Sequence, residues 1–395
     1  MQIPSALSNK VILILTPQAW GRMLLAKHHY AIELAKRGNE VYYLNPPDNK
    51  RWSISGSRIQ IRPDEHQQGL YIIDQQLYFP YRIKFHSRRL FHLLIKKQIR
   101  QIVQAIRKPI DIIWSFDIGN LFPLAYFDGS IFKVFHPVDE PPDKNALAAA
   151  AGAHVLFSVT REIIDKYKNW QIPSAFINHG LSEEFLDQPN HQNASGRQIN
   201  VGLSGNFLRP DLDRKILLQI VYGNPECIFH FFGVHIIADS NIGASEESET
   251  KEFIERLSDF SNVRFHGVLK THELAAALNK MDALLICYDM KLDQSKGTNY
   301  HKVMEYLSTG KVIISNNITT YREYPDLIRM NESREDNRLL PALFYDTIRN
   351  LNEWNNVMLV NKRKAYARNN AYSEQLTRIG HFIDGLLTKK YINEI

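Results

Sequence analysis

Short apolar runs alternate with segments of helical periodicity through both halves of the chain, and this alternation restricts the fold strongly. In the first half we predict strands at residues 11–15, 41–44, 110–114, 132–135, 155–159 and 175–177. In the second half we predict strands at residues 200–203, 228–232, 263–265, 283–287, 312–315 and 327–330. Strands separated by helices form parallel sheets through right-handed crossovers. The sequence therefore predicts an α/β protein with two doubly wound parallel sheets.

Length and composition divide the chain into two domains. A chain of 395 residues is too long for one compact core. The segment 187–198 (DQPNHQNASGRQ) is polar and aperiodic, as interdomain linkers are. We predict a first domain at 1–188, a linker at 189–198, a second domain at 199–353, and C-terminal helices at 354–395 that cross back toward the first domain. The acidic, serine-rich insert 238–250 is predicted to be a mobile loop.

Several classes of protein are not expected from this sequence. Its two cysteines, Cys227 and Cys287, offer neither a disulfide framework nor metal-ligand spacing, which favours a cytoplasmic location. No apolar run approaches the ~20 residues that span a bilayer, and no signal-peptide pattern is present. The dinucleotide fingerprint and the P-loop are both absent. Asp211 and Asp213 precede a helical run, where a carboxylate caps the first turn, so we predict no metal and no cofactor.

The positive charge is concentrated in the first half. Residues 1–190 carry 23 Lys and Arg against 17 Asp and Glu, whereas residues 191–395 carry 25 of each, so the first half supplies the whole net charge of +6. Between residues 81 and 108 there are nine basic residues and no acidic one. On a helix, Arg89, Lys96, Arg100 and Arg107 would share one stripe, roughly opposite Phe91, Ile95, Ile99, Ile102 and Ile106.

Two interpretations of this basic amphipathic helix stay open. It is typical of a membrane-surface element that faces anionic lipid. The alternative is a helix packed on its own sheet with a solvated basic face. Nucleic acid is not predicted as a partner, because no recognition motif accompanies the charge.

The segment 299–316 (NYHKVMEYLSTGKVIISN) combines a short helix with a buried strand. Gly310 supplies a left-handed C-cap between the two. The helix N-terminus presents backbone N–H groups, for which phosphate is a common ligand. Glu305, one turn into the helix, is placed to bind the two hydroxyls of a ribose. The alternative is an ordinary surface pair of Lys302 and Glu305.

An ordered series of motifs carries a resemblance to a known family. The second half contains NVRFHGV at 262–268, Glu273-Leu274, Asp282, Tyr288 and the helix 302–310. This series resembles the donor domain of the family-4 type retaining glycosyltransferases of the GT-B fold, which use nucleotide sugars. In the first half, Trp20, His28-His29, YLNPP at 43–47, VFHPVDE at 134–140 and INHGL at 177–181 resemble the acceptor domain of bacterial cell-envelope sugar transferases. The resemblance implies two Rossmann-like domains facing a cleft.

The resemblance also implies roles for individual residues. Glu305 would bind the donor ribose, and the backbone from His301 to Val303, with Lys302 beside it, would receive the pyrophosphate. The further donor-binding residues are Gly205 and Asn206 on the other side of the donor, and Gly267 and Val268 beside the nucleobase.

In the first domain, His136 corresponds to the cleft histidine that touches the transferred sugar, with Asp139 close by. Both are therefore the implied catalytic residues, although a lone histidine after a strand is more often structural. Trp20 and Gly21 are the implied acceptor-side residues.

The chain departs from the family pattern at two positions. Many members have a second glutamate eight residues before the ribose glutamate, where this chain has Gly297. Its role is absent or moves to Asp289 or Asp293. The family's arginine after the donor-domain glycine is Asn206 here, and Arg209 or Arg214 would supply the missing positive charge against the diphosphate. These two arginines complete the predicted donor-binding set.

The resulting expectation is a glycosyltransferase, retaining and metal-independent, that moves a sugar from a nucleotide-sugar donor to a glycan or lipid-linked acceptor in envelope polysaccharide synthesis. It would be cytoplasmic and would contact the anionic inner face of the cell membrane through the basic helix. One alternative is an idle transferase-like binding subunit, for which Gly297 is the hint. A nucleotide-sugar epimerase on the same fold is the other alternative.

Overall fold

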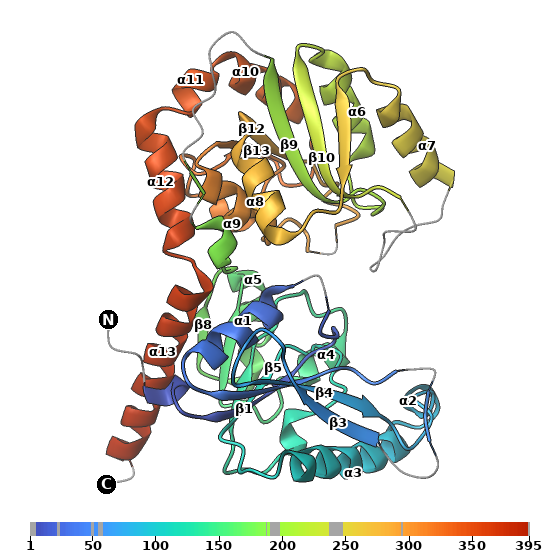
Figure 1. The fold of residues 1–395 in the computed structure, drawn as a ribbon, viewed down its shortest axis with the longest axis vertical. Coiled ribbons are helices and arrows are strands. Elements are labelled where there is room, and N and C mark those ends of the chain that lie inside the picture. Colours follow the sequence, from blue (N-terminus) through green and yellow to red (C-terminus); the bar gives the residue numbers. More distant parts are fainter. Residues whose placement is uncertain are drawn as a thin grey trace. The chain divides into compact units, whose positions relative to one another are not determined.

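The computed structural model describes residues 5–21, 24–48, 51–53, 58–186, 188–189, 198–236, 248–293 and 295–393. The chain divides into two compact units (Figure 1). Unit 1 comprises Met1–Asn178 and Tyr372–Ile395, and unit 2 comprises His179–Ala371. Most of the expected linker lies outside the described residues. The same holds for the loop expected at 238–250, except that its last three residues begin a helix at Ser248.

The described part of unit 1 contains an eight-stranded sheet of order β3-β4-β2-β1-β5-β6-β7-β8. Its strands are β1 (Val11–Leu15), β2 (Glu40–Leu44), β3 (Arg58–Pro63), β4 (Leu70–Gln76), β5 (Ile112–Ser115), β6 (Phe132–Phe135), β7 (Val155–Ser158) and β8 (Ser174–Phe176). Neighbouring strands are parallel except β3 and β4, which pair antiparallel. The sequence analysis missed these two strands. The edge strand β3 buries none of its six residues fully, so its sequence lacks an apolar run.

Helices cover both faces of the sheet in unit 1. They are α1 (Ala26–Lys36), α2 (Ile83–His86), α3 (Arg88–Ile106), α4 (Lys144–Ala148), α5 (Arg161–Lys166) and α13 (Tyr372–Asn393). Because successive strand residues point to opposite faces, β1 serves two cores. Leu13 and Leu15 pack in the cluster that contains the apolar side of α3. Ile12 and Ile14 pack in the cluster formed with α1 and α13.

Unit 2 contains, in its described part, a six-stranded parallel sheet of order β11-β10-β9-β12-β13-β14. The strands are β9 (Ile199–Asn206), β10 (Cys227–Val234), β11 (Val263–Gly267), β12 (Ala283–Ile286), β13 (Val312–Ser315) and β14 (Arg329–Met330). The helices are α6 (Arg214–Gly223), α7 (Ser248–Ser258), α8 (Thr271–Asn279), α9 (Lys302–Thr309), α10 (Leu340–Arg349), α11 (Leu351–Trp354) and α12 (Val357–Arg368). Asp213 caps α6 by accepting from the Ile216 N–H at 3.2 Å, as predicted.

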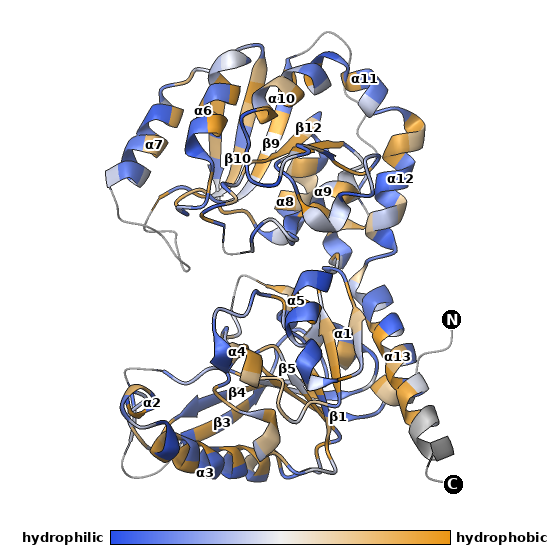
Figure 2. Cartoon of the chain, turned by 180° about the vertical axis from the view of Figure 1, so that it is seen from behind, coloured by the Kyte–Doolittle hydropathy of each residue, from blue (hydrophilic) through white to orange (hydrophobic). Residues whose placement is uncertain are grey.

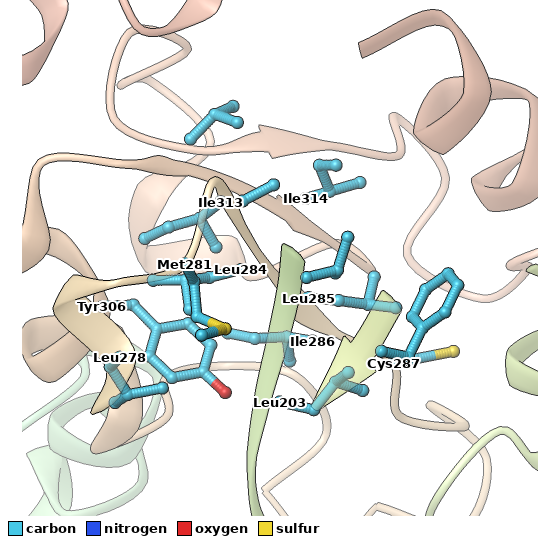
Figure 3. Packing of buried hydrophobic residues seen from close by; sticks show 14 of the residues in the cluster. Leu203, Leu278, Met281, Leu284, Leu285, Ile286, Cys287, Tyr306, Ile313 and Ile314 are labelled. Atoms are coloured by element: carbon cyan, nitrogen blue, oxygen red, sulfur yellow. The ribbon is translucent and has the colours of Figure 1, made fainter. Parts of the chain in front are cut away.

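The core of unit 2 lies around β12 and its neighbours. Figure 3 shows the ring of Tyr306 among Leu278, Met281 and Leu284. Tyr306 is fully buried, and its hydroxyl accepts a hydrogen bond from the Ser204 N–H at 2.6 Å. This bond joins α9 to β9, so the core itself fixes the helix N-terminus against the strand end. As predicted, α9 ends at Gly310 in the left-handed conformation.

The C-terminal helices belong to different units. Unit 2 contains α12, which packs against α9, whereas α13 packs beside α1 in unit 1. The buried residues of α13 in the unit 1 core are Tyr372, Leu376, Ile379 and Ile383. The boundary between the units lies at Asn178 and His179, ahead of the polar segment that the sequence suggested.

Candidate active site

The parallel sheet of unit 2 has one topological switch point, at its two central strands. From β9 the chain proceeds through β10 to β11 on one side, and β12 then returns to the other side of β9. Ligands of open α/β sheets bind at the carboxyl ends of the strands beside such a point. Ser204 and Gly205 lie at this end of β9, and Tyr288 follows the same end of β12. The N-terminus of α9 lies at this edge, because Lys302 contacts both strand ends.

Lys302 lies at the centre of this edge of the sheet, where the ends of β9 and β12 meet the N-terminus of α9. We call this place the Lys302 corner. Its ammonium donates to the Tyr288 hydroxyl at 2.7 Å and to the Ser204 carbonyl oxygen. Burial alone would lower the pKa of Lys302, but Tyr288, Tyr306 and Glu305 outweigh it, and the pKa lies above its usual value. The group is therefore a fixed positive charge at the helix N-terminus, and such a combination favours an anionic ligand.

Gly205 makes room for this ammonium. Its φ of +144° is one that side-chain-bearing residues rarely adopt. A Cβ at this position would lie 2.8 Å from Lys302 Nζ. The neighbouring Asn206 side chain accepts from the Leu208 N–H at 3.0 Å and shapes the turn that follows β9.

Glu305 stands one turn into α9 and is partly exposed. His301 Nδ1 lies 3.3 Å from Glu305 Oε1, and the exposed fraction of the Glu305 side chain is 17%. The carboxylate is thus held by a neighbour and still accessible, as binding of ribose hydroxyls requires. The Val303 N–H bonds the Tyr300 carbonyl oxygen at 3.1 Å. A ligand anion would therefore meet the His301 and Lys302 end of the helix rather than the Val303 amide.

The two candidate arginines differ in placement. Arg209 forms an ion pair with Asp211, with Nε 2.9 Å from the carboxylate, and its charge interacts with Tyr288 and Asp293. Arg214 instead donates to the Thr250 hydroxyl at 2.7 Å and lies over the ring of Phe253. The structure therefore brings Arg209 to the corner and directs Arg214 toward α7.

Gly267 and Val268 follow the edge strand β11. Gly267 has a φ of +69° and ends the strand, and the Val268 side chain is 50% exposed. An exposed apolar side chain at the carboxyl edge suits the face of a nucleobase, but no contact ties these two residues to Lys302.

Gly297 occupies the position of the second family glutamate, and its surroundings leave no room for a side chain. Its φ is +63°, and a Cβ would lie 2.1 Å from Met290 Cε and 2.8 Å from the Asn317 carbonyl oxygen. Asp293, one of the two predicted substitutes, accepts from the Gly297 N–H at 2.8 Å and from the Tyr300 hydroxyl at 2.7 Å. It therefore shapes this loop, and its role toward a transferred sugar stays a prediction.

His136 lies inside unit 1. Its Nδ1 is 3.4 Å from the indole nitrogen of Trp114, and its ring packs on Phe116 and Tyr30. Burial lowers the pKa of His136 to about 3, so the ring is neutral. None of the His136 surface is open to solvent. Its catalytic role stays a prediction.

The other predicted residues of unit 1 are more accessible. Asp139 is exposed, Trp20 is half-buried and Gly21 is exposed. The Trp20 N–H donates to Asn45 Oδ1 at 2.7 Å, which fixes the loop after β1 to the end of β2. This loop lies at the carboxyl edge of the unit 1 sheet.

The basic amphipathic helix is α3, preceded by the short α2. Figure 2 shows hydrophilic and hydrophobic residues interleaved along it. The predicted apolar side is confirmed as buried: Phe91, Ile95, Ile99, Ile102 and Ile106. Arg89, Lys96, Arg100 and Arg107 are all exposed, although Lys96 lies over the Tyr126 ring at 4.6 Å and Arg107 follows the last helical residue. Phe85, Leu90 and Leu93 are exposed apolar residues on the same two helices.

Within the described ranges, no three His, Cys, Asp or Glu residues are grouped as metal ligands. No helix in the same ranges is long and apolar enough to cross a bilayer.

Some contributors to the corner were missed from sequence. Ser204, Tyr300, Tyr306 and Asn316 line or brace the Lys302 environment. Tyr306 lies four residues after Lys302 and thus on the same helical face, a spacing that could have identified it.

Comparisons with known proteins give structural matches alone. No protein-family model and no curated protein matches the sequence. Sucrose-phosphate synthase from Thermosynechococcus elongatus matches with a TM-score of 0.69 and 11% identity, covering 96% of this chain and 100% of that one. Anabaena HepE, solved in complex with UDP-glucose, matches with a TM-score of 0.62, 12% identity and coverage of 96% and 100%. The lipopolysaccharide outer core galactosyltransferase WaaB matches with a TM-score of 0.61, 12% identity and coverage of 95% and 99%.

These matches extend over both units, and at this level of identity they establish the fold. The chain has the GT-B glycosyltransferase fold of two Rossmann-like α/β domains, which confirms the predicted fold class. Its activity has to be argued from the site, because one fold serves many functions.

Proposed function

We propose that this protein is a glycosyltransferase that takes its donor from the nucleotide sugars and binds it at the Lys302 corner of unit 2. The observation that carries the proposal is the Lys302 ammonium, held by Tyr288 and Ser204 at the N-terminus of α9. A partly exposed carboxylate, Glu305, follows one turn later. A diphosphate and a ribose are the two adjacent groups that need such partners.

The proposed chemistry follows from the charges. When a sugar leaves a nucleoside diphosphate, negative charge grows on the departing phosphate. Lys302, the α9 N-terminus and Arg209 would meet that charge without a metal, and preorganised groups of this kind lower a barrier by a few kcal/mol each. We expect retention of the anomeric configuration, with the departing phosphate oxygen accepting the proton of the acceptor hydroxyl.

We further propose a glycan or lipid-linked acceptor in envelope polysaccharide synthesis, at the cytoplasmic face of an anionic membrane. The support is the basic surface of α2 and α3, with exposed Phe85, Leu90 and Leu93 between its cations. WaaB, which has the same fold, is a lipopolysaccharide galactosyltransferase.

The first test is calorimetric titration with UDP-, GDP- and ADP-sugars. We expect one nucleotide series to bind, and Glu305→Ala to weaken that binding by about 1–3 kcal/mol through lost hydroxyl contacts. Glu323→Ala is the control, because Glu323 is an exposed carboxylate elsewhere in unit 2. If no nucleotide sugar binds, the donor site is refuted. We expect sugar transfer to persist in the presence of a metal chelator. Loss of transfer under that condition would refute metal independence.

An idle, transferase-like binding subunit is the second candidate. The packing around Gly297 favours it, since no carboxylate can enter there. Donor binding combined with no transfer and no donor hydrolysis, over a broad acceptor panel, would support this alternative over the enzyme.

A further inference from the structure

A hollow of about 500 Å³ lies beside α12, the helix that packs against α9 in unit 2. We call it the α12 hollow. All of its lining residues belong to unit 2, and none of them lies at the Lys302 corner. Its volume is that of a small-molecule site. The lining residues are Gln188, Asn361, Lys364, Ala365, Arg368 and Asn369.

One face of α12 forms most of this lining. Counted from Asn361, the lining residues of α12 and its C-cap fall at positions i, i+3, i+4, i+7 and i+8, which places them along one side of the helix. Leu359, Arg363 and Ala367 form the buried side. The hollow is therefore lined by the solvent side of α12, and the described residues that line it include two cations, three amides and no carboxylate.

Lys364 and Arg368 stand one turn apart, and both line the hollow. Arg368 is exposed, whereas Lys364 is half-buried because its stem lies across the C-cap of α9. A Cβ on Gly310 would lie 3.0 Å from Lys364 Cε. The C-terminus of α12 favours one cation in its last turn, and Arg368 meets that preference. A second cation four residues away weakens the helix, so helix stability does not account for the pair.

A third cation increases the positive potential at this place. Lys311 follows Gly310, against which the Lys364 stem lies. Burial lowers the pKa of Lys364, and the charges of Lys311 and Arg368 lower it further. A bound anion would reduce this repulsion between like charges.

The lining groups indicate the class of ligand. Two cations one turn apart match the double charge of a phosphate monoester, and the planar fork of Arg368 fits two of its oxygens. The amides of Asn361 and Asn369 can donate to hydroxyls and accept from them. Gln188 Nε2 donates to the Glu184 carbonyl oxygen at 2.8 Å, which fixes the third amide. The hollow is large enough to hold a sugar as well as its phosphate.

We propose that the α12 hollow binds a soluble sugar phosphate. Lys364 and Arg368 hold the phosphate, and the amides of Asn361 and Asn369 contact the sugar hydroxyls. The site is distinct from the donor site, because Lys364 lies against the C-cap of α9 whereas Lys302 begins that helix. The inference goes beyond the proposed function, since it adds a second ligand and does not depend on sugar transfer.

The binding test is a ³¹P NMR titration of the full-length protein with glucose 6-phosphate as the probe. We expect saturable binding that weakens as salt is added. Arg368→Gln and Lys364→Met should each raise the Kd about tenfold, since each removes a charge-assisted hydrogen bond. The control is Lys362→Met, which removes the same charge from the same helix. Lys362 does not line the hollow and pairs with Asp326, so the Kd should not change. No saturable binding, or an equal loss in the control, would overturn the site.

Two further probes test the kind of phosphate. Inorganic phosphate lacks the sugar, so we expect it to bind more weakly than glucose 6-phosphate. Equal affinity would overturn the assignment to a sugar phosphate. Dihexanoyl phosphatidylglycerol is a singly charged diester and should also bind more weakly. Tighter binding of this lipid would assign the hollow to a membrane headgroup and would overturn the proposal of a soluble ligand.

Ala365 allows a test that removes no cation. It is exposed and lines the hollow between Lys364 and Arg368 in sequence. Ala365→Glu adds a carboxylate beside both cations, whereas Ala365→Gln adds a side chain of nearly the same size without charge. Both are good helix formers, so both variants should fold. We expect Ala365→Glu to abolish binding and Ala365→Gln to weaken it less than about threefold. Equal loss in the two variants would overturn the argument from charge.

The Lys302 corner also attracts phosphate, so the two sites have to be separated. Lys302→Met should leave the Kd for glucose 6-phosphate unchanged, and Arg368→Gln should leave the affinity for nucleotide sugars unchanged. Loss of glucose 6-phosphate binding in Lys302→Met would place the probe at the Lys302 corner and would overturn the second site.

Discussion

A Cβ on Gly205 would lie 2.8 Å from Lys302 Nζ, so the backbone of β9 and the ammonium on α9 depend on each other. The close approach is possible because Gly205 has no side chain, and it leads to a first prediction. Gly205→Ala should lower the free energy of unfolding by about 1–3 kcal/mol through backbone strain, and it should weaken donor binding by displacing the ammonium. Urea unfolding and calorimetry measure the two effects.

The control for this substitution is Gly223→Ala at the end of α6. An added Cβ there meets nothing within 4 Å. Because alanine is a better helix former, this variant should gain up to about 0.5–1 kcal/mol. Equal behaviour of the two variants would contradict the argument from Lys302.

Removing the Lys302 charge should affect the ligand. Lys302→Met is expected to raise the Kd for UDP or the corresponding nucleotide by at least tenfold, because a charge-assisted hydrogen bond contributes about 1.5–3 kcal/mol. Tyr288→Phe removes the hydroxyl that holds the ammonium at 2.7 Å and should have a smaller effect. If Tyr288→Phe weakened binding more than Lys302→Met, the tyrosine and not the lysine would be the primary ligand.

Introducing the family glutamate at position 297 should destabilise the protein and should not increase its activity. Gly297→Glu places a side chain where Met290 and the Asn317 carbonyl oxygen already lie, and it forces a residue with a side chain to a φ of +63°. We expect a loss of about 2 kcal/mol or more in unfolding free energy and no gain in transfer rate. A stable variant with higher activity would show that the loop rearranges to admit the carboxylate.

Acid should destabilise the chain through its buried histidines. Burial lowers the pKa of His28 to about 4 and that of His136 to about 3, whereas an unfolded histidine has a pKa near 6.5. Below about pH 6.5 the unfolded chain therefore binds protons that the folded chain does not. Stability should be constant above that pH and fall below it by about 1.4 kcal/mol per pH unit for each histidine.

Urea midpoints between pH 7.5 and 5.5 measure this slope. His28→Gln should remove one proton from the pH dependence of the unfolding free energy. A midpoint that rises on acidification would contradict the burial of these rings.

The basic surface predicts binding to anionic vesicles. Replacing Arg89, Arg100 and Arg107 with glutamine should reduce cosedimentation with phosphatidylserine-containing vesicles roughly fivefold per residue, and added salt should reduce it further. Neutral vesicles should bind weakly. The matched control replaces Arg51, Arg58 and Arg62, three arginines that are exposed elsewhere in the same unit. An equal loss in both variants would indicate a general charge effect and not a docking face.

Periodicity predicted the fold where side chains are buried on both sides. Strands such as β12, with four fully buried residues, appear as continuous apolar runs. The edge strand β3 is partly solvated and has no such run, so it was missed. Likewise the apolar side of α3 could be predicted from sequence. The position of Arg107 could not, because the helix ends at Ile106 and Arg107 lies just beyond it.

Only those residues of the candidate site that lie on one helix could be predicted together from the sequence. Lys302 and Glu305 share α9, so their spacing fixes their relation. The Tyr288 and Ser204 partners come from other strands, and only the folded sheet brings them to the ammonium. Burial of His136 was likewise invisible, because its neighbours Trp114 and Tyr30 lie on a different strand and a helix.

The position of α13 determines the order in which the two units can be completed during synthesis. All of unit 2 has been made before Tyr372 is added, whereas the core of unit 1 still lacks Leu376, Ile379 and Ile383. The core of unit 1 can therefore close only after α13 has been made, later than the last residue of unit 2.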